Sequence, residues 1–324
     1  MRRSAIVAAT AASLIVLAGC TPPVPDPALA PPPQETSAIT DSQIDRIVPA
    51  TFAELAAADE ARDASLLGDR VSGTAQTIRD VQYQLRKAGD KSAIETLPST
   101  MQAVYVSAEG VYPRMLVGVS EAAEGSTPVV SMWLQPDVDS QYSMVEWAHM
   151  IPGATLPAMP GTTVGANQLP LDTDQVPITP EQAVEDYVTL LQNGAGSKFN
   201  DQFEPDTYRQ RLFAARKVLT DAAKKGDGNY VDTVETRMDE TYAMATADGG
   251  ALVFAPLRIA SSLRVKGGAT VSISDADKAL VEGKVSDRIT HIYRDFVIIH
   301  IPADAEAKPA VVAADHHVVR VRAN

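Results

Sequence analysis

The sequence predicts an α+β protein made of two similar modules, each with N-terminal helices packed on a curved antiparallel sheet. Residues 39–150 and residues 178–324 each begin with helical spacing of apolar residues and continue with strand-like alternation. Between them, residues 151–177 are rich in proline and glycine and follow neither period, which indicates an interdomain linker. Helices that precede a run of strands favour an α+β layout. The chain is therefore interpreted as a tandem repeat, with one divided α+β domain as the alternative.

The first helix of each half carries the same start signal. Residues 39–43 (ITDSQ) and 178–182 (ITPEQ) both place a threonine three residues before a glutamine. In such a capping box the threonine side chain accepts a hydrogen bond from the helix, and the glutamine side chain reaches back to the threonine amide. Pro180 suits the first helical position, whereas Pro49 is expected to kink the first helix.

A second helix follows in each half and ends near a glycine. Basic residues occupy the last turns before Gly89 and Gly226, as is typical of helix C-termini. Strands are then predicted in the first half at residues 101–110, 115–119, 129–134 and 143–150. In the second half they are predicted at residues 238–248, 252–259, 269–273, 289–301 and 317–321.

The N-terminus has the features of a secretory signal. Arg2 and Arg3 precede an apolar run that is too short to span a bilayer as a helix. The run closes at residues 17–20 (LAGC), which resemble a lipobox; the resemblance implies that residues 1–20 form a lipoprotein signal peptide. Cys20 would then carry a diacylglyceryl group as the first mature residue. Residues 21–38 form a Pro-rich linker.

Composition excludes several classes of function. A net charge of −13 argues against nucleic acid as a partner and against a basic membrane-binding patch. Cys20 is the only cysteine, so its acylation would leave no thiol for disulfides, zinc ligation or catalysis. We expect the protein to be lipid-anchored on the extracytoplasmic face of the cell membrane.

The lipobox, the proline-rich spacer and the α+β modules together resemble uncharacterised lipoproteins of actinobacteria, whose function is unassigned. The layout of each module is similar to the cystatin-like or NTF2-like arrangement. This resemblance implies a membrane-anchored extracellular lipoprotein. It supplies no catalytic residue and no cofactor that could be carried over to this chain.

The scarce tryptophans predict where a ligand would bind. Trp133 and Trp147 gather with Met132 and Met144 in one region of the predicted first sheet. Methionine and tryptophan can line an adaptable apolar pocket, although the same residues can also form the core of the module. We therefore expect a non-catalytic binding or scaffold module, whose partner is a small apolar molecule or another envelope protein.

Metal binding by the C-terminal histidines is one alternative. Four of the five histidines lie late in the chain, and an aspartate, Asp295 or Asp315, would add an oxygen ligand for a metal such as zinc. Neighbouring residues of a strand point to opposite faces, so about two imidazoles at most can meet. These histidines are His291, His300, His316 and His317.

A tethered enzyme is the other alternative. Acid and base chemistry in an NTF2-like cone uses a carboxylate or a histidine whose burial shifts its pKa. One candidate group is Asp295 with His291 beside Tyr293. The other candidate group consists of Glu146, Trp147 and His149.

Replacing Cys20 with serine tests the predicted anchor, because the substitution removes the thiol that would be acylated. We expect C20S to be released from the membrane fraction or misprocessed, whereas the unaltered protein sediments with membranes. Fractionation followed by immunoblotting measures this difference. Unchanged membrane retention of C20S would contradict lipid anchoring.

Overall fold

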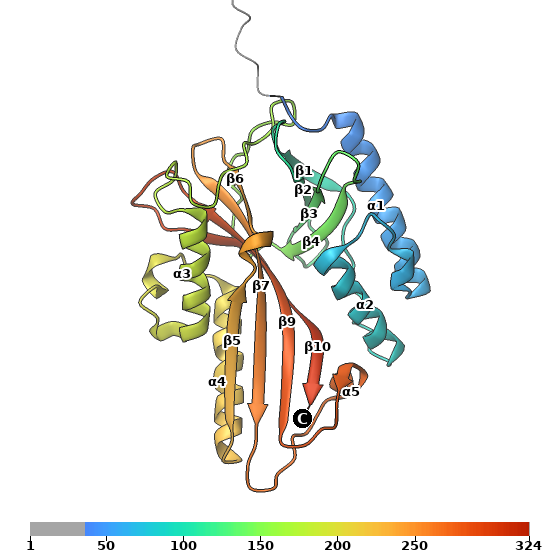
Figure 1. Ribbon diagram of the computed structural model, residues 1–324, viewed down its shortest axis with the longest axis vertical. Coiled ribbons are helices and arrows are strands. Elements are labelled where there is room, and N and C mark those ends of the chain that lie inside the picture. Colours follow the sequence, from blue (N-terminus) through green and yellow to red (C-terminus); the bar gives the residue numbers. More distant parts are fainter. Residues whose placement is uncertain (1–35, 324) are drawn as a thin grey trace, which may run out of the picture. The chain divides into compact units, whose positions relative to one another are not determined.

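The computed structural model describes residues 36–323. The predicted signal peptide, Cys20 and most of the Pro-rich linker lie outside the described residues. The chain from Glu35 onward forms one compact unit, and its helices and two sheets confirm the α+β prediction (Figure 1). None of the helices in the described part has the length and apolar character needed to cross a membrane.

The first half consists of two helices followed by a four-stranded antiparallel sheet. The strands pair in sequence order, β1-β2-β3-β4. At the predicted capping box, Gln43 Oε1 accepts a hydrogen bond from the Thr40 amide at 2.8 Å, and the first helix continues through Pro49. The elements are α1 (Asp41–Ala61), α2 (Gly73–Lys87), β1 (Met101–Val106), β2 (Arg114–Ser120), β3 (Val129–Gln135) and β4 (Ser143–His149).

The second half also begins with two helices, and its long strands are antiparallel neighbours in the order β5-β7-β9-β10. At its start Thr179 caps the helix, while Gln182 donates to Asp186. The two helices are α3 (Pro180–Asn193) and α4 (Thr207–Lys225). The long strands are β5 (Asn229–Thr236), β7 (Ala251–Arg264), β9 (Arg288–Ile301) and β10 (Ala310–Ala323). Shorter elements are β6 (Tyr242–Ala245), α5 (Asp275–Leu280) and β8 (Val281–Glu282).

The structure departs from the strand predictions in the second half at three places. Residues 269–273 form a loop before α5, in which buried Val271 makes a backbone hydrogen bond to Ser286. Residues 229–236 form β5, an edge strand that was not predicted. It was missed because it buries only Asp232 and Val234 and lacks a clear apolar face. Residues 238–240 form a short 3-10 helix instead of the start of a strand.

One apolar cluster joins the two halves. Phe254 of β7 and Phe296 of β9 stack with ring centroids 6.4 Å apart, and they pack with Met115 and Met132 of the first sheet. The predicted interdomain linker, residues 151–177, runs along both sheets. It forms isolated bridges to Ser107 before β2 and to Met244 in β6. The first and second halves therefore share a core.

Replacing Phe254 with alanine tests whether the two halves unfold together. Loss of a buried phenylalanine should cost about 3–5 kcal/mol in free energy of unfolding. Trp133 and Trp147 both lie in the first sheet, so their fluorescence reports on the half that does not contain the substitution. We expect the fluorescence transition of F254A to shift to lower temperature together with its circular dichroism transition.

The matched control is Val231→Ala, at an exposed position of β5, which should shift neither transition appreciably. Independent halves would give a different result for F254A. The tryptophan transition would stay where it is in the unaltered protein while circular dichroism reported earlier melting.

Candidate functional site

A cavity of about 680 Å³ lies between the two sheets. This volume is in the range of small-molecule sites. One wall consists of β3, β4 and the first turn of α2, and the other consists of β7, β9, β10 and the residues that follow β5. The cavity therefore exists only because the two halves pack against each other.

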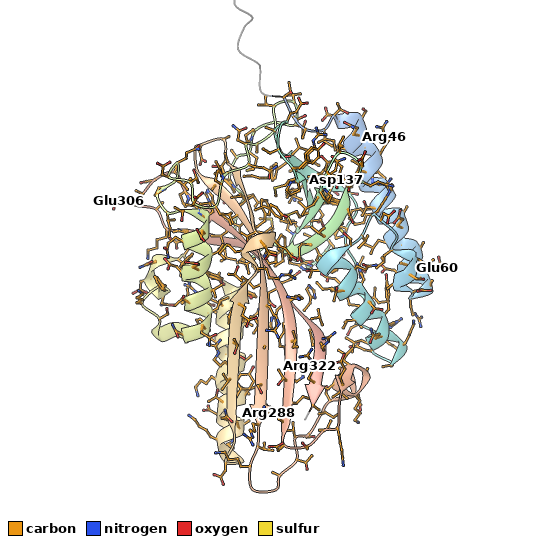
Figure 2. All side chains as sticks on the ribbon, viewed as in Figure 1. Arg46, Glu60, Asp137, Arg288, Glu306 and Arg322 are labelled. Atoms are coloured by element: carbon orange, nitrogen blue, oxygen red, sulfur yellow. The ribbon has the colours of Figure 1, made fainter. Side chains whose placement is uncertain are left out.

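Arginine dominates the wall that the second half provides. Arg258 of β7 lies directly opposite Arg294 of β9, and Arg320 of β10 lies opposite Ile292 in the same sheet. Like charges that face each other across antiparallel strands are destabilising. Arg322, near the C-terminal end of β10, is labelled in Figure 2. The arginines that line the cavity are Arg237, Arg258, Arg294, Arg320 and Arg322.

Ion pairs neutralise most of these arginines. The pairs are Arg237 with Glu240, Arg258 with Glu235, and Arg320 and Arg322 with Glu282. Arg294 forms no ion pair with any residue that the structure describes, and its buried Nη1 has no hydrogen-bond partner there either. Burial and the nearby Arg237 and Arg258 lower the pKa of Arg294. A cation without a partner thus faces the cavity of a protein whose net charge is −13.

Glu146 of β4 is in the same cavity and is only 3% exposed. Burial raises the pKa of its carboxyl to about 8, against the opposing effects of a hydrogen bond with Thr74 and the charges of Arg294 and Arg237. Within residues 36–323 its Oε2 atom has no hydrogen-bond partner. At neutral pH this carboxyl is protonated in most molecules, so it can donate a hydrogen bond to an anion.

The start of α2 adds to the positive potential of the cavity. Gly73, Thr74 and Thr77 of its first turns line the cavity. The hydroxyl of the N-cap residue, Ser72, makes no capping hydrogen bond and instead accepts from Ser143 at 2.7 Å. Backbone amides at a helix N-terminus favour a nearby anion.

The rest of the lining is apolar or aromatic. Three of these residues, Met132, Leu134 and Val145, come from the first half, so the arginine-rich wall faces a wall of mixed polar and apolar character. A molecule that complements both walls carries negative charge and an apolar part. These residues are Met132, Leu134, Val145, Tyr242, Pro256, Ile292 and Val319.

Of the four residues predicted to bind a ligand, Met132 alone lines the cavity. Trp133, Trp147 and Met144 are fully buried in the core beneath α1 and α2. Trp133 Nε1 donates to Thr51 at 3.1 Å, and Trp147 Nε1 donates to Glu95 at 3.1 Å. Met132 and Trp133 are neighbours in β3 and therefore point to opposite faces of the sheet.

The first predicted acid–base group lies outside the cavity. His291 pairs with Asp277 at 2.7 Å and stacks on Tyr293. Asp295 is 1% exposed, accepts a hydrogen bond from Tyr208 of α4 and lies 2.8 Å from His316 Nδ1. These side chains lie on the sheet face that α4 covers.

The late histidines are divided between the two faces of the second sheet. His316 contacts Asp295, whereas His317 lies near Asp315 and against Trp147 of the first half. Burial lowers the pKa of His300, whose pairing position in β9 is opposite Leu252. As predicted, adjacent histidines point in opposite directions, and the late histidines do not form one cluster.

The arginines of the cavity were missed because charged residues on strands usually face solvent. A signal for them does exist in the sequence. Arg294 lies between Ile292 and Phe296 at a spacing of two, which places it among apolar residues in the middle of its strand. An arginine among apolar residues needs a partner of opposite charge.

Comparison with known proteins finds one family. A family described as a domain of unknown function (DUF8094) matches residues 35–322. No curated protein and no solved structure matches this chain. The matched range includes every residue that lines the cavity. The chain belongs to the DUF8094 family, a domain of unknown function.

Proposed function

We propose that this protein is a membrane-anchored extracellular lipoprotein that binds a phosphate-bearing amphiphile, without catalysis, in its arginine-lined cavity. The observation that carries the proposal is Arg294. Its half-buried guanidinium has a buried Nη1 atom without a partner among the described residues, and it lies opposite Arg258 in the neighbouring strand. A buried charge is costly unless it is paired. A bound anion would supply the missing partner.

The chemistry of the lining favours phosphate as the charged group. The planar guanidinium matches phosphate oxygens with two parallel hydrogen bonds. A protonated Glu146 and the amides at the start of α2 would add further donors. The apolar side chains on the first-half wall, Met132, Leu134 and Val145, suit an alkyl or isoprenoid chain. This proposal keeps the expected binding role and moves it from the tryptophans to the cavity.

The lipid anchor at Cys20 remains a prediction from the sequence. If it is present, it would hold the cavity close to the membrane surface, where amphiphiles occur. The long spacer at residues 21–38 would allow the folded part to reach ligands at some distance from its own anchor.

We also infer that the two halves are a tandem repeat of one cystatin-like or NTF2-like module. Each half has two helices followed by strands that pair in sequence order, β1-β2-β3-β4 and β5-β7-β9-β10. The cavity would then have arisen where the two copies meet. This origin would explain why both modules contribute to its lining.

A tethered enzyme is a second candidate, and Glu146 is the observation that favours it. A buried carboxyl with a pKa of about 8 in a concave, charged site is typical of a general acid. As water attacks the phosphorus of a bound phosphate ester and the P–O bond to the alkyl group breaks, Glu146 would give its proton to the departing alkoxide, which leaves as the alcohol. Release of inorganic phosphate from hexyl phosphate by the unaltered protein, abolished in E146Q, would favour this candidate over simple binding.

Replacing Arg294 with methionine tests the proposed binding. Isothermal calorimetry measures the affinity for hexyl phosphate. Separate titrations with inorganic phosphate and with hexanol measure the affinity for the charged part and for the apolar part of the ligand. We expect R294M to bind hexyl phosphate at least about 10-fold more weakly, since charge-assisted hydrogen bonds contribute about 1.5–3 kcal/mol each. Folding should be retained, because the substitution removes a half-buried charge that has no ion-pair partner in residues 36–323.

The matched control is Arg264→Met, at the exposed end of β7, where the arginine pairs with Asp287 outside the cavity. R264M should bind hexyl phosphate as the unaltered protein does. Equal affinity of R294M and the unaltered protein, or no binding by the unaltered protein, would contradict the proposed site.

Replacing Glu146 with glutamine tests its raised pKa. Because the folded protein holds this proton more tightly than the unfolded chain, Glu146 should lower stability as pH rises from about 4.5 toward 8. Glutamine does not ionise, so E146Q does not lose stability in this way. Its free energy of unfolding should therefore increase relative to the unaltered protein by at most about 1.4 kcal/mol per pH unit in that range.

Urea denaturation at a series of pH values measures this difference between E146Q and the unaltered protein. The difference should level off above pH 8, where the folded carboxyl is also ionised. A difference that does not change between pH 5 and 8 would mean that Glu146 has an ordinary pKa.

A further inference from the structure

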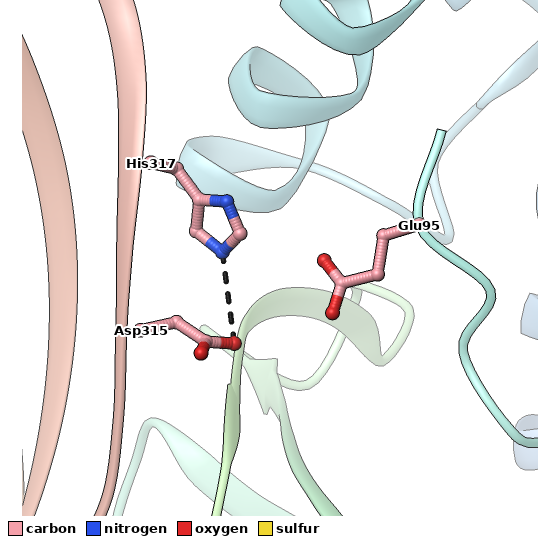
Figure 3. A group of neighbouring side chains, drawn as sticks. All are labelled: Glu95, Asp315 and His317. Atoms are coloured by element: carbon pink, nitrogen blue, oxygen red, sulfur yellow. Dashed lines mark ion pairs between the residues drawn. The ribbon is translucent and has the colours of Figure 1, made fainter. Parts of the chain in front are cut away.

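Two imidazoles and two carboxylates meet where the first half contacts β10, outside the lining of the arginine cavity. Glu95 lies in the segment between α2 and β1, and His149 ends β4. Asp315 and His317 are on β10, two residues apart and on the same face. Figure 3 shows the Glu95 carboxylate directed toward the side chains of Asp315 and His317.

The ligand atoms of Glu95, Asp315 and His317 lie close enough together to bind one metal ion, and His149 Nδ1 contacts both carboxylates. His149 Nδ1 is 2.9 Å from Asp315 Oδ2 and 3.2 Å from Glu95 Oε1, and His317 Nε2 is 3.7 Å from Asp315 Oδ2. One ligand atom each from Glu95, Asp315 and His317 lies within 4.8 Å of the others. Zinc bonds of about 2.0–2.1 Å in a tetrahedron place ligand atoms about 3.4 Å apart.

His317 is poorly satisfied without a further partner. Its Nε2 atom is buried and has no hydrogen-bond partner in residues 36–323. The separation of 3.7 Å from Asp315 is too long for a hydrogen bond. Nε2 is therefore within ion-pair distance of Asp315 but makes no hydrogen bond, which leaves it able to bind a metal ion (Figure 3).

Neighbouring groups hold the cluster in place. Trp147 Nε1 donates to Glu95 Oε2, which leaves Oε1 directed at His149. The Trp147 ring also packs edge-on against His317, with centroids 5.7 Å apart. Arg79 donates to the backbone carbonyl of Glu95 at 2.7 Å. Metal ligands in proteins are usually oriented by such outer contacts.

We propose that Glu95, His149, Asp315 and His317 form a binding site for a divalent transition metal, with zinc as the best fit. Two imidazoles and two carboxylates without a thiolate match zinc in tetrahedral geometry. The two carboxylates balance the charge of the ion. The ion would connect β4 and the Glu95 segment to β10, and would thus fasten the first half to the second beside the cavity.

The test is zinc titration of the full-length protein after dialysis against a chelator. Isothermal calorimetry should give one zinc per chain, and the thermal unfolding temperature should rise with bound zinc because the metal binds the folded state. Cobalt in place of zinc should give the visible spectrum of a tetrahedral site. No stoichiometric zinc binding by the folded protein would overturn the proposal.

Variants then test the assignment of ligands. H317Q and H149Q should each bind zinc at least about 10-fold more weakly, as expected for loss of a ligand. The matched control is His316→Gln, because His316 neighbours His317 but points to the opposite face of β10. H316Q should bind zinc as the unaltered protein does.

Tryptophan fluorescence of the zinc-free variants shows whether they fold, so that weak binding is not confused with unfolding. Two variants at different elements keep the test informative if one of them fails to fold. Zinc affinity of folded H317Q or H149Q equal to that of the unaltered protein would overturn the assignment. R294M should retain zinc binding, which separates this site from the arginine cavity.

Discussion

The rest of the structure depends on the packing of two sheets against each other around Phe254 and Phe296. The same two faces form both the shared core and the cavity. Along β9, Phe296 belongs to the core, whereas Arg294, one step away on the same face, belongs to the cavity lining. The apolar contact holds the halves together. Beyond it, the two faces are far enough apart to leave the cavity that the arginines line.

Charge in this protein is distributed unevenly. The chain carries a net charge of −13, yet its cavity brings together five arginines, one of them without an ion pair in the described part of the chain. A fold under no functional demand would gain stability by replacing the facing Arg258 and Arg294 with apolar residues. The nearby Glu146, kept mainly protonated by burial at neutral pH, adds little opposing charge. These features are explained together if an anion is the normal occupant.

Local features of the fold were predictable from the sequence, and long-range ones were not. Helix starts at Thr40 and Thr179 follow from capping chemistry, and the central strands follow from their alternation of apolar residues. β5 was missed because an edge strand has no clear apolar face. The cavity could not be located, since its two walls come from distant segments of the sequence, residues 73–146 and 237–322. For the same reason, nothing in the sequence brings Glu95 and His149 to Asp315 and His317.

The most direct test of the central claim is native mass spectrometry of the protein recovered gently from the membranes of its source organism. Tandem fragmentation of any bound species identifies its chemistry. We expect a bound amphiphile that releases phosphate-containing fragments and that is absent from the R294M variant recovered in the same way. A bound species that is neutral or cationic, or an amphiphile retained by R294M, would contradict the proposed binding.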